Sequence, residues 1–309
     1  MTFPHNFFTR VFIVSLSICL IGITAAAQAP LPTLAPPPPG AAPGAPLPTT
    51  AQAPAYPPAE LDRIVSPIAL YPDPLLAQVL AASTYWDQIP EAARWADEHH
   101  YLAGDQLNQA VVADQLPWDP SVQSLLPFPS VLDMMASAPA WTQEVGSAFL
   151  VNSAAVMDSV QRERQLAQTY GYLQSNATVR VMGGPYIQIL PVNPAYIVVP
   201  YYDPRVVFVR PRPGFRVTAA VRFGYGVSIG AVWAPWGWGA TRFDWGARTV
   251  IIANAPWRRT WTNRVEYVHP FTVRRSERRV PETHRAVPRS EHERATQWQG
   301  EREREEHRR

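Results

Sequence analysis

The sequence predicts an α-dominated α+β protein, in which a compact array of short helices packs with a small antiparallel sheet. Apolar residues recur at helical spacing from residue 59 to about residue 173, and the period becomes alternating near Thr178. The flanks differ from this part, because Pro and Ala dominate before it and Arg and Glu after it. Such flanks bury too little apolar surface to fold, so we expect both to be disordered.

Residues 1–27 have the pattern of a secretory signal peptide. The apolar run from Val11 to Ile23 is too short to span a bilayer comfortably, and the small residues Ala25, Ala26 and Ala27 follow it. We expect cleavage between Ala27 and Gln28. The mature chain would then have no transmembrane span and would lie in the periplasm or cell envelope of a bacterium.

The basic residues and the single cysteine exclude several kinds of chemistry. All 27 basic residues are Arg, which excludes a phosphate-binding loop with its Lys, a Schiff-base Lys and a Ser-x-x-Lys motif. Cys19 lies inside the signal peptide, so the mature chain has no thiol for a disulfide, a zinc site or a nucleophile. Lipidation of Cys19 is disfavoured because the bulky Ile18 precedes it.

Residues 28–58 form a Pro/Ala-rich linker. It centres on four consecutive prolines at 36–39 and favours extended polyproline II geometry. One alternative is that the linker is a ligand of groove-type recognition domains. We favour a semi-rigid tether that holds the folded part away from a membrane or wall.

Residues 59–176 form the helical part, which begins with the stretch around Asp73 and Pro74. Asp73 is placed to cap a helix and Pro74 to occupy its first turn. Leu75, Leu76, Val79 and Leu80 fall on one face and predict a buried stripe. Helices are expected at 60–70, at 74–83, from 90, at 105–116, after the prolines at 120 and 129, and in one long segment from 141 to 170.

Residues 177–210 form the predicted β part. Thr178 to Met182 and Tyr186 to Leu190 alternate, with Gly183-Gly184 as a two-residue hairpin loop. Tyr196 to Val199 and Val206 to Val209 add two more strands. Four short strands predict one small antiparallel sheet with helices covering one face.

The remaining chain divides into two segments. Residues 211–257 are rich in Gly and Trp and show no clear helical or strand period. Residues 258–309 hold 14 Arg against 9 Glu, a surplus of five positive charges, with few aliphatic residues. We expect this Arg/Glu/His-rich tail to be disordered, with transient helix near Glu301 to Arg309.

Several motifs together resemble one known family. They are Pro67 to Leu76, Trp118 to Val122, Phe128-Pro129, Trp141 to Gln143, Ile189 to Pro194 and Val198 to Pro204. In this order they resemble the domain of unknown function 3300 family of exported bacterial proteins, over roughly residues 61–208. The resemblance implies an envelope location and supplies no activity.

The candidate recognition residues are aromatic or basic. Tyr71, Trp118 and Tyr202 each stand beside an Asp-Pro pair, which suits either sugar stacking or turn and capping chemistry, and we favour the latter. Trp236 and Trp238 are further aromatic candidates in the Gly/Trp segment. The cleanest basic patch of the tail is formed by Arg274, Arg275, Arg278 and Arg279.

The sequence indicates no catalytic residues, metal ligands or cofactor. Asp97-Glu98-His99-His100 looks like a metal cluster, but adjacent residues of a helix point in different directions. There is no Gly-x-Ser-x-Gly motif. A pair of carboxylates that cleaves glycosidic bonds stays an open hypothesis, because such a pair is defined by its distance in space and not by its spacing in the sequence.

We therefore expect a non-enzymatic structural or interaction module of the cell envelope. One alternative is a hydrolase that acts on cell-wall or polysaccharide material. A second is an Arg-mediated binder of polyanions, with anionic envelope polymers or lipid head groups as partners. Export argues against nucleic acid as the partner of the tail.

Overall fold

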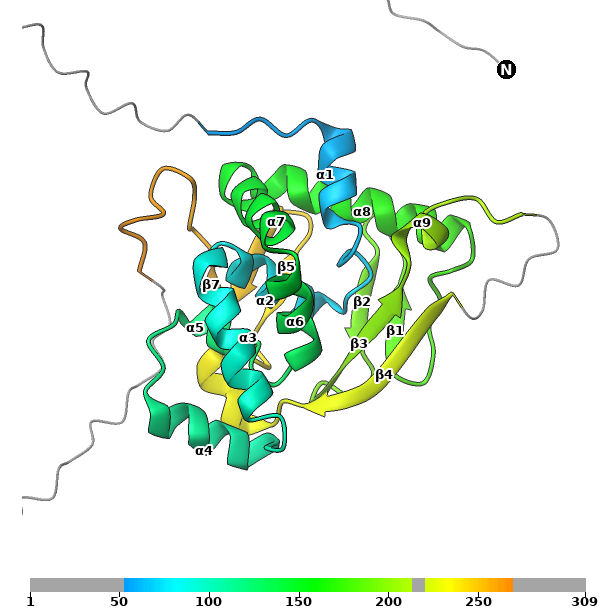
Figure 1. Ribbon diagram of the computed structural model, residues 1–309. Coiled ribbons are helices and arrows are strands. Elements are labelled where there is room, and N and C mark those ends of the chain that lie inside the picture. Colours follow the sequence, from blue (N-terminus) through cyan, green and yellow to red (C-terminus); the bar gives the residue numbers. More distant parts are fainter. Residues whose placement is uncertain (1–52, 213–219, 269–309) are drawn as a thin grey trace, which may run out of the picture. The chain divides into compact units, whose positions relative to one another are not determined.

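The computed structural model describes residues 53–212 and 220–268 (Figure 1). The signal cleavage site at Ala27 and Gln28, most of the linker, and the arginines at 274, 275, 278 and 279 lie outside the described residues. The described part is a helix-dominated α+β fold with small antiparallel sheets, as predicted.

The helices are short and follow one another closely along the chain. They are α1 (Pro58–Val65), α2 (Asp73–Ser83), η1 (Trp86–Gln88), α3 (Ile89–Glu98), α4 (Gly104–Asp114), α5 (Pro120–Gln123), α6 (Pro129–Ser137), α7 (Pro139–Val151), α8 (Ser153–Thr169), α9 (Pro204–Val207) and η3 (Ala231–Trp236). Most of the α-helices carry Pro in the first two positions, where the missing N–H removes no helical hydrogen bond.

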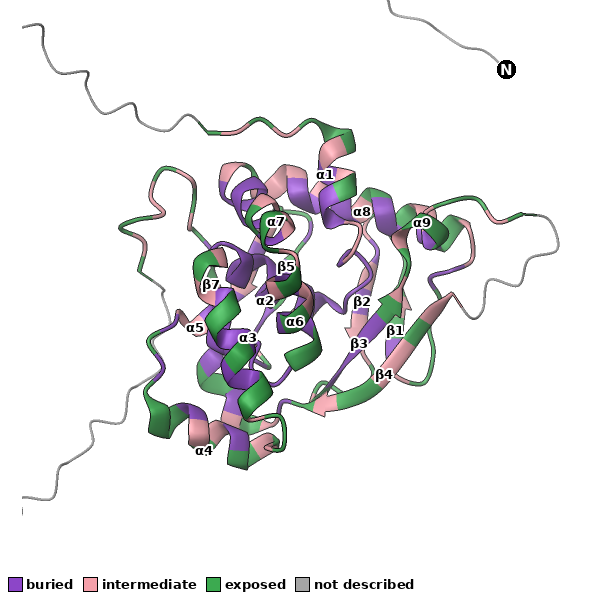
Figure 2. Ribbon diagram, in the orientation of Figure 1, coloured by how far each residue is buried: buried purple, intermediate pink, exposed green. Residues whose placement is uncertain are grey.

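Helix α2 lies at the centre of the helical part. Leu75, Leu76, Val79 and Leu80 have no exposed surface, so the predicted apolar stripe is confirmed. The burial exceeds that prediction, because Pro74 is the only residue of α2 that is not buried. Helices α5 and α7 and strands β2, β5 and β6 all contact it, so α2 is enclosed rather than covered on one side (Figure 2).

The predicted long helix from 141 to 170 is two helices. Asn152 separates α7 from α8 with φ at −154°, and its side-chain oxygen accepts a hydrogen bond from Ala155 N at 3.0 Å. The break arises because a capping Asn satisfies the first turn of α8. Helix α8 then packs along α1.

The strands form three separate small sheets. Strand β1 (Val179–Met182) pairs with β2 (Gln188–Pro191), β3 (Tyr196–Tyr202) pairs with β4 (Val221–Ser228), and β5 (Arg242–Asp244) pairs with β6 (Thr249–Ile252), which pairs with β7 (Ala255–Pro256). All pairs are antiparallel. The prediction of one four-stranded sheet is therefore wrong.

Two local expectations for the β part also need correction. The loop between β1 and β2 runs from residue 183 to residue 187, longer than the predicted Gly-Gly hairpin. The predicted strand from Val206 to Val209 overlaps helix α9, because Asp203 accepts a hydrogen bond from Arg205 N at 2.9 Å and starts a helical turn. The partner of β3 is β4, from the Gly/Trp-rich segment.

The Gly/Trp-rich segment completes the hydrophobic core of the helical part. Trp233, Trp236 and Trp238 are at most 2% exposed. Trp236 Nε1 donates to Gln123 Oε1 at 2.9 Å, and Trp238 Nε1 donates to Ser124 O at 3.0 Å. The indole N–H groups thus bind α5 and the turn after it.

The first residues of the predicted disordered tail pack on the core. The guanidinium of Arg259 lies 3.6 Å from the centre of the Tyr85 ring and donates to Thr84 O at 2.5 Å. The rings of Tyr267 and Trp257 lie 5.4 Å apart. The expectation of disorder is wrong for residues 258–268, because cation–π and aromatic contacts replace the missing aliphatic ones. Residues 269–309 lie outside the described residues.

Candidate functional site

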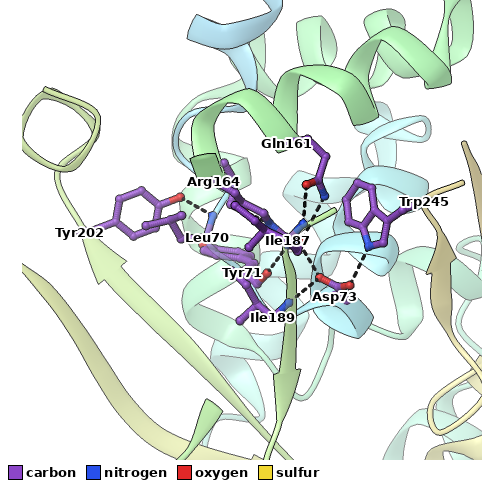
Figure 3. Close-up of polar contacts among 10 residues, drawn as sticks. Leu70, Tyr71, Asp73, Gln161, Arg164, Ile187, Ile189, Tyr202 and Trp245 are labelled. Atoms are coloured by element: carbon purple, nitrogen blue, oxygen red, sulfur yellow. Dashed lines mark hydrogen bonds and ion pairs between the residues drawn. The ribbon is translucent and has the colours of Figure 1, made fainter. Parts of the chain in front are cut away.

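Arg164 of α8 is a fully buried cation that binds three backbone carbonyls (Figure 3). Its Nε donates to Ala69 O at 2.8 Å, its Nη1 to Ile187 O at 2.8 Å, and its Nη2 to Tyr71 O at 3.0 Å. A guanidinium has five donors in a fixed fork, which suits several acceptors at once. Arg164 thereby joins α8 to the turn before α2 and to the residue before β2.

Asp73 is the counter-ion of Arg164. Its Oδ1 lies 2.7 Å from Arg164 Nη1 and also accepts from Ile189 N at 3.2 Å. Its Oδ2 accepts from Trp245 Nε1 at 3.0 Å, and the Trp245 ring centre is 5.1 Å from the guanidinium carbon of Arg164. The prediction that Asp73 caps α2 is wrong, because its carboxylate is taken by these partners. Both carboxylate oxygens of Asp73 accept hydrogen bonds from the protein, so the Asp73–Arg164 ion pair has a structural role.

The aromatic residues beside the Asp-Pro pairs occupy the core and its margin. Tyr71 is 4% exposed and Trp118 is 9% exposed. Tyr202 donates from its hydroxyl to Ser66 O at 2.8 Å and accepts from Leu70 N at 3.2 Å, while burial raises its pKa well above the usual value. Together with the buried Trp236 and Trp238, these residues do not form one exposed aromatic surface.

The exposed aromatic side chains are different ones, which the sequence interpretation missed. Tyr225 is 100% exposed and Tyr196 is 49% exposed. Tyr225 lies between Gly224 and Gly226 of β4. Tyr196 of β3 lies beside Gly226, because a Cβ placed on Gly226 would be 3.4 Å from Tyr196 Cβ. The signal was the alternation of Gly224-Tyr225-Gly226 within a strand, where glycines leave room for a cross-strand aromatic ring.

Tyr196 and Tyr225 line a cavity of about 390 Å³ on the β3–β4 sheet. Val198, Gly226, Thr178 and Val192 also line this tyrosine hollow. Tyr196 and Val198 alternate with Ile197 and Val199, which belong to the main core, so the hollow lies on the face of β3 away from that core. Its walls suit stacking against a flat apolar face.

A second cavity, of about 400 Å³, lies where α3 ends and α4 begins. His99 and His100 line it together with Leu102, Leu107 and Val227. The Nδ1 atoms of the two histidines lie 2.8 and 2.6 Å from the carbonyl oxygens of Trp95 and Asp97, so each Nδ1 carries the proton. Within residues 53–212 and 220–268, no group of three or more His, Cys, Asp or Glu could hold a metal ion.

One buried acid has a strongly altered ionisation. Burial raises the pKa of Glu163 to about 7, with a further contribution from the neighbouring Asp62 carboxylate. Asp62 itself accepts from Ser159 Oγ at 2.5 Å and pairs with Arg162 at 2.6 Å. Neither acid lines the tyrosine hollow or the His99–His100 cavity.

The comparison with known families agrees with the motifs. A family model described as protein of unknown function (DUF3300) matches residues 57–299. The chain belongs to the DUF3300 family. The match extends beyond the predicted range of residues 61–208, because it also includes the Gly/Trp-rich segment and residues 258–299 of the tail.

One relative of this chain is the uncharacterized protein YacH of Escherichia coli (strain K12). It is 38% identical over 187 residues, which covers 50% of this chain and 30% of YacH. The matched part is thus under a third of that longer relative. No solved structure is significantly similar to this DUF3300 chain. Among the helices of the described residues, none has the length and apolar character needed to cross a membrane.

Proposed function

We propose that this protein is exported to the bacterial cell envelope and acts there as a non-enzymatic interaction module. The signal-peptide pattern of residues 1–27 supports export. The family itself is one of unknown function, so the role is argued from the surface of the folded part.

The observation that carries the proposal is the position of the exposed hydrophobic side chains. Among the described residues, most of the large exposed hydrophobic side chains lie between residues 182 and 225. They are Met182, Val192, Tyr196, Tyr201, Val206, Val209 and Tyr225. Of these residues, Val192, Tyr196 and Tyr225 line the tyrosine hollow together, and exposed apolar residues that line one hollow are typical of a binding site.

The tyrosine hollow suits an envelope polysaccharide. Tyrosine rings stack on the apolar faces of sugar rings, and the lining residues Thr178 and Asn193 offer polar groups to sugar hydroxyls. Among the residues that the structure describes, no Asp or Glu lines the hollow, which favours binding over hydrolysis at this site. Binding without reaction is therefore the function that this geometry supports best.

Co-sedimentation with insoluble cell-wall polysaccharide tests this function. We expect Tyr225→Ser and Tyr196→Ser to release the protein into the supernatant with little change in melting temperature. Tyr101→Ser is the matched control, because Tyr101 is 70% exposed but lies outside the hollow. Equal binding of the polysaccharide by all three variants would show that the tyrosine hollow is not the binding site.

Export has its own test. Mass spectrometry of the protein from fractionated cells should find a mature chain that begins at Gln28. A full-length chain in the cytoplasm, or a lipid-modified Cys19 at the new terminus, would contradict this part of the proposal.

The hydrolase alternative has one observation in its favour. Glu163 has the raised pKa of a general acid, and the Asp62 carboxylate lies near it. Release of reducing ends from purified peptidoglycan, abolished by Glu163→Gln, would support it. We favour the module because Asp62 is already held by Arg162 and Ser159.

The polyanion-binding alternative depends on the tail. Replacing Arg274, Arg275, Arg278 and Arg279 with Gln should weaken binding to anionic vesicles, most at low salt, because exposed charges are screened beyond about 8 Å at physiological ionic strength. Undiminished binding would move the interaction to the folded part.

A further inference from the structure

The segment from Arg205 to Arg212 presents both aliphatic and cationic side chains to solvent. Val206 is 38% exposed and Val209 is 56% exposed. Arg205, Arg210 and Arg212 are exposed as well. We call these five residues the α9 patch.

The backbone of α9, which carries Arg205 and Val206, is fixed to the core. Asp203 caps α9 through Arg205 N, and Val207 is fully buried in a hydrophobic cluster with Leu70 and Ile189. The Phe208 ring packs edge-on against Tyr202, with ring centres 6.0 Å apart. The two valines are therefore held in place by the inward-facing residues Val207 and Phe208 between them, and Figure 1 shows α9 directly after β3.

The α9 patch has an excess of positive charge. The carboxylate of Asp203 lies 3.4 Å from Arg205 Nε, in an exposed pair. Within the described residues, no acidic side chain pairs with Arg210 or Arg212. Arg222 is exposed at the nearby start of β4, where Val221 pairs with Tyr202. The charge of the α9 patch therefore favours an anionic partner.

We propose that the α9 patch docks the protein on the surface of an anionic lipid bilayer. The arginines complement anionic head groups, which attract each nearby Arg by about 1 kcal/mol. The valines decide between a bilayer and a soluble polyanion, because aliphatic side chains gain free energy at the boundary between head groups and acyl chains. A hydrated soluble polyanion has no apolar region into which the two valines could insert. This site is separate from the tyrosine hollow and needs no polysaccharide.

Co-sedimentation with phosphatidylglycerol vesicles tests the cationic half of this proposal. The full mature chain is used, with the four tail arginines at 274, 275, 278 and 279 changed to Gln throughout so that the tail does not contribute. Arg210→Gln with Arg212→Gln should lower the partition coefficient on the order of 30-fold. Arg94→Gln with Arg180→Gln is the matched control, since both arginines are exposed and lie on α3 and β1. An equal loss in this control would show an effect of net charge alone and overturn the proposal.

The valines test the bilayer against a soluble polyanion. Val206→Asn with Val209→Asn should lower vesicle binding several-fold but leave binding of soluble polyphosphate unchanged. Neutral phosphatidylcholine vesicles should not bind the parent. If the valine variant bound phosphatidylglycerol as well as the parent, the patch would not be a bilayer site. Polysaccharide binding and cell fractionation are unaffected by this outcome, so failure here is distinguishable from failure of the proposed function.

Discussion

Arg164 Nη1 and Asp73 Oδ1 lie 2.7 Å apart, although 91 residues separate the two positions in the chain. Both side chains are at most 3% exposed. The pair joins α8 to the first residue of α2, and Ile189 and Trp245 attach a strand and the Gly/Trp-rich segment to the same carboxylate. Segments from four regions of the sequence are therefore held by one buried ion pair.

Breaking this pair should destabilise the protein strongly. Asp73→Ala leaves the Arg164 charge buried without a counter-ion, and we expect the free energy of unfolding to fall by about 3–5 kcal/mol. Asp158→Ala removes the partner of Arg248, at the same 2.7 Å but with both side chains more than 40% exposed. Loss of that exposed pair should have a much smaller effect, because solvent screens the two charges. Urea denaturation measures both, and similar losses would contradict the assignment of Asp73 as the central contact.

Truncating the buried face of α2 should also be costly. Leu76→Ala or Leu80→Ala empties a site with no exposed surface, so we expect a loss of about 2–5 kcal/mol. Val112→Ala on α4 is the control, because Val112 is 37% exposed. Thermal melts measure this difference. If all three variants had the same melting temperature, α2 would not be the organising helix.

A methyl group at Gly146 should be destabilising although alanine favours helices. Gly146 lies within α7, and a Cβ there would collide with Ser83 O at the end of α2. We expect a loss of about 1–3 kcal/mol or more from overpacking. Gly183→Ala is the control, because open space surrounds that position. Unchanged stability of Gly146→Ala in a chemical denaturation series would mean that α2 and α7 do not approach this closely.

Glu163 should make stability depend on pH. Burial raises the pKa of Glu163 to about 7 in the folded state, above the unperturbed value of 4.5. The folded state therefore binds more protons between these values, so its stability falls as the pH rises from about 4.5 to about 7. Glu163→Gln stays neutral, and its stability relative to the parent should rise across this range by up to roughly 3 kcal/mol. A difference between variant and parent that is constant from pH 5 to pH 8 would contradict the raised pKa.

The position of many helices followed from local sequence. Proline in the first turn and apolar residues three or four apart predict α2 and α3 to within a residue or two at their starts, because capping and periodicity are properties of neighbouring residues. The family followed from the same motifs, since Pro67 to Leu76 and Val198 to Pro204 carry it in order. Asp119 and Asp203 cap α5 and α9 for the same local reason.

The partners of β3 and of Asp73 were decided by tertiary structure. Strand β3 pairs with β4, which follows it only after α9 and residues 208–220. The alternation of residues from Tyr196 to Tyr202 predicts a strand but does not predict its partner. The carboxylate of Asp73 looked like a helix cap, but a buried guanidinium from α8 binds it more strongly than the free N–H groups of its own helix. Likewise the sequence makes Trp236 a candidate recognition residue, but the structure buries it in the core, where its Nε1 donates to Gln123. Composition and spacing describe what each segment can do alone, whereas burial and ion pairing depend on which distant segment comes to lie beside it.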